Sequence, residues 1–63
     1  MASYFYIVVP FWDAVSIASV YAKYQRFDNL KDARAEANRV LYSRIAKIQI
    51  DPNGDLLEYE LMY

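Results

Sequence analysis

The chain of 63 residues contains no cysteine and no histidine, and it has only one glycine. Without thiol and imidazole groups it lacks the commonest nucleophiles, proton shuttles and transition-metal ligands. A single glycine is too few for a glycine-rich phosphate-binding loop, and disulfide bonds are excluded. We therefore expect a protein that is not an enzyme and that uses no metal and no other cofactor.

A chain of this length has room for one hydrophobic core, because it buries only roughly 60% of its unfolded surface. We expect residues 1–63 to form a single compact domain. Chains this small are usually reinforced by disulfides, a metal or a partner. With the first excluded and the best metal ligands missing, self-association or binding to a partner is the expected source of reinforcement.

The sequence has no segment typical of membrane insertion or secretion. The apolar stretch from Met1 to Val9 is far shorter than the ~20 residues of a membrane-spanning helix, and Pro10 and Asp13 follow it. No basic stretch leads into a long apolar core, as it does in a secretory signal. We expect a cytoplasmic protein without membrane contact, in the cytoplasm of a host cell if the protein is viral.

Charge is unevenly distributed, although the net charge is only −1. The tail from Ile48 onward carries four acidic residues and no base. All seven bases lie in the middle of the chain, where three acidic residues oppose them: Lys23, Arg26, Lys31, Arg34, Arg39, Arg44 and Lys47. The basic middle segment and the acidic tail can pair within the domain, or head to tail between two copies of the chain. The ordinary interpretation of this charge pattern is a solvated helix face beside a solvated hairpin.

The C-terminal third predicts a β-hairpin. Apolar and polar residues alternate over 46–50, and the alternation resumes over 57–63. Between them, residues 51–55 include Pro52, which suits the first corner of a turn, and Gly54, which suits a left-handed position. This loop offers too few oxygen ligands for calcium.

A helix is predicted at about 29–43, with Asp28 or Asn29 as its N-cap. Apolar side chains recur at spacings of three and four, which places them on one stripe. These residues are Leu30, Ala33, Ala37, Val40 and Leu41.

The N-terminal half is less decisive. Residues 4–9 are β-branched and aromatic and predict a strand that ends near Pro10. Residues 14–27 support two interpretations: a helix capped by Asp13, or a strand with a bulge before Ser19. We favour the strand, since a second helix would leave the first strand without a sequential partner.

The expected fold is therefore α+β, with the order β-β-α-β-β and one helix packed on a mostly antiparallel sheet of about four strands. One helix covers only one face of such a sheet, so the other face should be open. The side chains expected beneath the helix are Phe5, Ile7, Val9, Val20, Ile48, Ile50, Leu57, Tyr59 and Leu61. Those expected on the open face are Tyr4, Tyr6, Val8, Tyr21, Lys23, Lys47, Gln49, Glu58 and Glu60.

Seven tyrosines in so short a chain indicate a binding surface, because tyrosine is enriched at interface hot spots. We predict that the open sheet face binds a larger protein or protein complex, with the basic flank of the helix steering the approach. The partner-binding residues are then Tyr4, Tyr6, Tyr21, Lys23, Arg34 and Lys47. If residues 14–27 form a helix instead, Tyr21 turns into the core.

Two alternatives use the same face. It can bind single-stranded nucleic acid, with tyrosines as stacking platforms and lysines on phosphates, although the acidic Glu58 and Glu60 disfavour this. It can also be the interface of a homodimer. The carboxylates indicate no catalytic pair, because they lie in a turn, on one strand face and on the helix.

In size and pattern, a very short chain without cysteine or histidine and with one helix on a small sheet is similar to the compact inhibitors that phages and other mobile elements make. Anti-CRISPR proteins and inhibitors of RNA polymerase are examples. The resemblance rests on size and pattern, and no sequence motif carries it. It implies a large host complex as the partner and steric occlusion as the mode of action.

Overall fold

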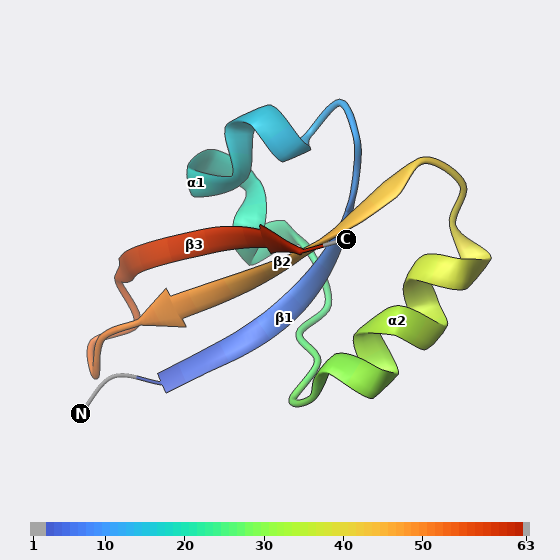
Figure 1. Cartoon of the computed structure of the whole chain (residues 1–63). Helices are drawn as coiled ribbons and strands as arrows, with labels where there is room; N and C mark the ends of the chain where they lie inside the picture. Colours follow the sequence, from blue (N-terminus) through green and yellow to red (C-terminus); the bar gives the residue numbers. More distant parts are fainter. Residues whose placement is uncertain (1–2, 63) are drawn as a thin grey trace.

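Three strands form one antiparallel sheet in the order β1-β2-β3 (Figure 1). They are β1 (Ser3–Pro10), β2 (Ser43–Ile50) and β3 (Leu56–Met62). This computed structural model describes residues 3–62, so the expected strand position of Tyr63 lies outside the described residues. The strand predicted at 4–9 is confirmed, and it ends at Pro10 as expected.

The predicted hairpin is also confirmed, and its first strand begins three residues earlier than the alternation indicated. Asp51 organises the turn, because its Oδ1 accepts hydrogen bonds from the backbone N–H groups of Asn53 and Asp55, both at 2.9 Å. Gly54 has φ +91°, the left-handed conformation that glycine adopts without steric cost. A register shift at Gln49/Ile50 lies at the end of β2, directly before this turn.

Both faces of the sheet carry a buried apolar cluster, and a helical segment packs against each cluster. One face carries a core cluster that includes Phe5, Ile7 and Ile48. The other face carries a smaller cluster built on Val8 and Ile45. The expectation of one covered and one open face is therefore wrong, since Figure 1 shows helical segments on opposite sides of the sheet.

The first cover is the segment predicted as a strand, and that prediction is wrong. It consists of η1 (Ala14–Ser16), α1 (Ile17–Val20) and η2 (Tyr21–Lys23). The fold therefore has three strands rather than four and a second helix, and β1 takes β2 as its partner.

A helical path explains how this segment reaches the core. The spacings of four and three direct Ile17, Tyr21 and Tyr24 onto the same sheet face, and Ile17 is completely buried there. A strand in this place could only have extended an edge of the sheet and would have left the apolar face uncovered.

The second cover is α2 (Leu30–Arg39). Asn29 is its N-cap, and its Oδ1 accepts the backbone N–H of Asp32 at 2.8 Å. Ala33 is completely buried and allows the helix to approach Val8 and Ile45 closely. The helix therefore lies on the face predicted to be open, opposite the side chains that it was expected to cover.

Helix α2 ends at Arg39, four residues before the predicted end. Val40 is already extended, and the Ser43 hydroxyl donates to the carbonyl oxygens of Ala37 and Val40 at 3.2 and 2.9 Å. The Ala37 carbonyl also accepts the backbone N–H of Val40 at 3.3 Å, and the Ser43 hydroxyl gives the Val40 carbonyl a partner at the helix end. Leu41, placed on the apolar stripe by its spacing, is instead 80% exposed.

Ile17→Ala should lower the free energy of unfolding by about 2–5 kcal/mol, since it removes a buried branched side chain and leaves a cavity. In a domain of this size, each kcal/mol corresponds to about 4–8 °C in Tm. Val15→Ala is the matched control, because Val15 lies in the same segment and is 85% exposed. Equal effects of the two substitutions in thermal and urea unfolding would contradict the assigned role of Ile17.

Candidate functional site

The structure brings together three of the six residues predicted to bind a partner. Tyr4, Tyr6 and Lys47 share one sheet face, on which Tyr6 and Lys47 are cross-strand partners. The two tyrosine rings meet edge to face with centroids 5.8 Å apart, and Lys47 Nζ lies 4.4 Å from the centroid of the Tyr4 ring. Tyr6 is half-buried against the α2 cluster, so of these two rings only Tyr4 is widely exposed.

The other three predicted residues lie elsewhere. Tyr21 packs against the core on the opposite sheet face, where its hydroxyl donates to the Gly54 carbonyl at 3.5 Å. Lys23 is exposed in η2, and Arg34 is exposed on α2. The predicted aromatic platform is therefore smaller than expected, because the helical conformation of residues 14–23 turns Tyr21 inward.

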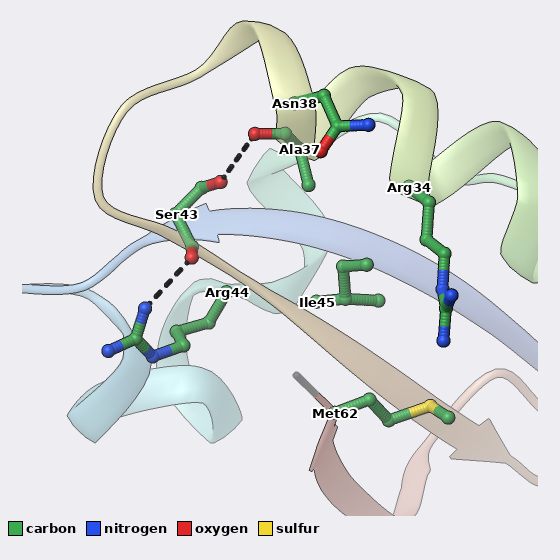
Figure 2. Close-up of a pocket in the computed structure, with 7 residues that line it drawn as sticks. All are labelled: Arg34, Ala37, Asn38, Ser43, Arg44, Ile45 and Met62. Carbon is green, nitrogen blue, oxygen red and sulfur yellow. Dashed lines mark hydrogen bonds between the residues drawn. The ribbon is translucent and has the colours of Figure 1, made fainter.

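Arg34 borders a crevice of about 380 Å³ between α2 and the start of β2. In Figure 2 the Arg34 side chain extends from α2 past Ile45. The Arg44 side chain extends in another direction, and its guanidinium group donates to the Ser43 carbonyl at 3.1 Å. The two guanidinium groups diverge, so they do not form a joint site. The crevice also lies at the C-terminal end of α2, where the helix dipole disfavours an anion.

Four exposed apolar or aromatic residues lie at the end of the sheet away from the hairpin. We call this surface the aromatic patch and define it by Phe11, Trp12, Leu41 and Tyr42. Their exposed fractions are 52, 62, 80 and 72%, respectively. Sequence analysis missed this surface, since Phe11 and Trp12 lie outside any periodic segment and Leu41 fitted a helical stripe. The sequence signal that could have identified this surface was the aromatic pair Phe11 and Trp12, directly after the proline that ends β1.

Two loops that are distant in sequence form the aromatic patch. The backbone N–H of Phe11 donates to the carbonyl of Tyr42 at 2.8 Å and joins the loop after β1 to the loop before β2. Phe11 makes edge-to-face ring contacts with Trp12 and Tyr42, with centroids 5.3 and 6.2 Å apart. Beside these rings is a recess of about 470 Å³, lined by Phe11, Tyr42 and Arg44.

Tyr42 has an unusual backbone conformation, with φ +58°. The left-handed region costs a residue with a side chain about 1–2 kcal/mol and is a marked outlier for a bulky residue. It turns the chain from the end of α2 into β2, a position that glycine or asparagine would occupy without this cost. A tyrosine is instead held there with its ring mostly exposed.

A side-chain hydrogen bond fixes the loop after β1. The Tyr24 hydroxyl donates to Asp13 Oδ2, and the backbone N–H of Asp13 donates to the Pro10 carbonyl at 3.0 Å. The bond to Asp13 raises the pKa of Tyr24 above its ordinary value, and partial burial and the negative charge of Asp13 add to this effect. Trp12 thus lies between two anchored residues.

Comparison with known protein families, with curated proteins and with solved structures finds no match to the chain. Within residues 3–62, no helix is both long and apolar enough to cross a membrane. The same residues contain no group of three side chains placed to hold a metal ion. The chemistry that the described surface offers is apolar and aromatic contact, with a guanidinium group beside it.

Tyr24→Phe should lower the free energy of unfolding by about 1 kcal/mol near neutral pH, because one hydrogen bond is lost. The raised pKa of Tyr24 means that the bond contributes fully below pH ~10, the ordinary tyrosine pKa. That contribution is lost as pH rises through the folded-state pKa. Urea unfolding of both proteins between pH 8 and 12 should therefore show a stability difference that shrinks at alkaline pH, whereas a constant difference would contradict the assignment.

Proposed function

We propose that the protein is a small non-enzymatic binding module that inserts the aromatic patch into an apolar groove on a larger protein. The observation that carries the proposal is Tyr42, whose left-handed backbone and exposed ring stand beside Phe11 and Trp12. Strained residues of this kind cluster at functional sites, where the surrounding structure holds them in place. The strained conformation places the Tyr42 ring in solvent, where little of the ring is buried.

The composition of the aromatic patch supports protein binding. Tryptophan, tyrosine and arginine are the residues most enriched at interface hot spots. Here Phe11 makes ring contacts with both Trp12 and Tyr42, and Arg44 lines the adjoining recess. A partner groove lined by apolar side chains is the complementary surface.

The aromatic patch is also anchored before it meets a partner. The Phe11–Tyr42 backbone bond joins its two loops, and the Tyr24–Asp13 bond fixes the residue that follows Trp12. Loops that are already ordered lose less conformational entropy on binding, which leaves more of the contact energy for affinity.

The mode of action that we propose is steric occlusion of a larger complex in the cytoplasm, as with the phage inhibitors that the chain resembles in size and pattern. Two contacts argue against the nucleic-acid alternative on the Tyr4 face. Lys47 already occupies a face of the Tyr4 ring, and Glu60 is the cross-strand partner of Lys47. An incoming base would compete with the lysine for that ring face, and an incoming phosphate would lie near a carboxylate.

Trp12→Ala and Tyr42→Gly should each weaken binding to the partner by about 30-fold or more, the effect of a 2 kcal/mol hot spot. Tyr42→Gly should leave Tm unchanged or raise it, because glycine relieves the backbone strain. A loss of binding in this variant therefore cannot be attributed to a loss of folding. Tyr4→Ala is the control, since Tyr4 is also an exposed tyrosine but lies outside the aromatic patch.

The measurement is affinity capture from a host-type lysate with and without nuclease, followed by titration of the recovered complex with each variant. The proposal requires a complex that survives nuclease, binds wild type and Tyr4→Ala alike, and is lost with both patch variants. Capture that depends on Tyr4 or on nucleic acid would overturn it. So would a homodimer in sedimentation that dissociates on Trp12→Ala.

A further inference from the structure

Strand β3 forms an open edge of the sheet. Within residues 3–62 its backbone pairs with β2 and with no other segment. The opposite edge is partly closed, because Tyr6 of β1 exchanges two backbone hydrogen bonds with Phe27, at 2.9 and 2.8 Å. An open edge presents unpaired N–H and C=O groups that can accept a further strand.

The bonding pattern identifies which groups of β3 face outward. Both backbone groups of Tyr6 point to Phe27, so its cross-strand partner Lys47 bonds to β3 rather than to β1. Lys47 is paired with Glu60, and neighbouring residues of a strand point in opposite directions. The backbone groups of Tyr59 and Leu61 therefore point away from the sheet.

The side chains along this edge differ in character between its two faces. Glu58 and Glu60 project on the face of Tyr4 and Lys47, and within residues 3–62 neither makes an ion pair. Tyr59, the cross-strand partner of the core residue Ile48, projects on the other face and is 44% exposed. A strand added beside β3 would meet two carboxylates on one face and apolar side chains on the other.

We propose that the β3 edge is a second docking site, separate from the aromatic patch. It accepts an extended segment of another protein in which basic and apolar residues alternate, as a fourth strand. The basic side chains lie across from Glu58 and Glu60, and the apolar ones lie beside Tyr59 and Leu61. Main-chain hydrogen bonds hold the segment, and charge selects it.

Charge disfavours a second copy of the chain as the occupant. Antiparallel pairing of two β3 strands centred on residue 58, 59 or 60 sets a glutamate opposite a glutamate, which destabilises the pair. Pairing of β3 with the edge of β1 from another copy gains no charge partner, because Ser3–Pro10 contains no charged residue. The occupant is therefore a basic segment from a different protein.

The test uses a fluorescent seven-residue peptide in which lysine alternates with isoleucine and threonine. A matched glutamate peptide and a lysine peptide N-methylated on its edge-facing amides are the controls. The lysine peptide should bind at least about tenfold more tightly than either control, and amide shifts should be confined to the region around residues 57–61. Equal binding of the lysine and N-methylated peptides, or shifts elsewhere, would overturn the proposal.

The double substitution Glu58→Lys/Glu60→Lys should reverse the preference, so that the glutamate peptide binds more tightly than the lysine peptide. Both positions are exposed, and circular dichroism confirms that the fold is retained. Trp12→Ala should bind the lysine peptide as wild type does, which separates failure of this site from failure of the aromatic patch. If the lysine peptide does not bind, the docking site is overturned. Glu58 and Glu60 would then serve to protect the edge against aggregation.

Discussion

The fold depends on covering an apolar cluster on each face of a three-stranded sheet. Each covering segment is anchored by one completely buried side chain, Ile17 in α1 and Ala33 in α2. The two anchors work differently: Ile17 fills space above the larger cluster, whereas Ala33 permits a close approach of helix to sheet. Small chains have little area to bury, so both covers are needed and little of the chain is left for anything else.

The position of the two covering segments in the chain determines where the exposed aromatic side chains lie. Both covers are inserted between β1 and β2, so the chain must leave β1 and enter β2 at the same end of the sheet. The Phe11–Tyr42 backbone bond forms where those two crossings meet. The topology therefore determines where the aromatic patch lies, but it does not require aromatic residues there. Any residues that allow the two turns would complete the fold.

Local chemistry made part of the fold predictable. Strand alternation and the turn around Gly54 determined the hairpin, and Asn29 marked the start of α2. Tertiary contacts decided the rest. Residues 14–24 satisfy both periodicities, and the uncovered sheet face selected the helix. Leu41 has helical spacing, yet the Ser43 bonds end α2 before it. At the candidate site, alternation brought Tyr4, Tyr6 and Lys47 together, but loop residues carry no period that could have identified the aromatic patch.

Two surface features are unfavourable for the isolated chain: Tyr42 strains the backbone, and the open β3 edge is a site for aggregation. Glycine or asparagine at position 42 would remove the strain that Tyr42 imposes on the backbone. A lysine, a proline or a covering loop would protect the β3 edge more fully than two glutamates on one face. A domain this small has a narrow margin of stability, so costs of this kind are significant. Backbone strain and an unprotected edge that the topology does not require are most simply explained by contacts with other molecules. The two proposed surfaces differ in chemistry, because the aromatic patch is apolar and the β3 edge carries carboxylates.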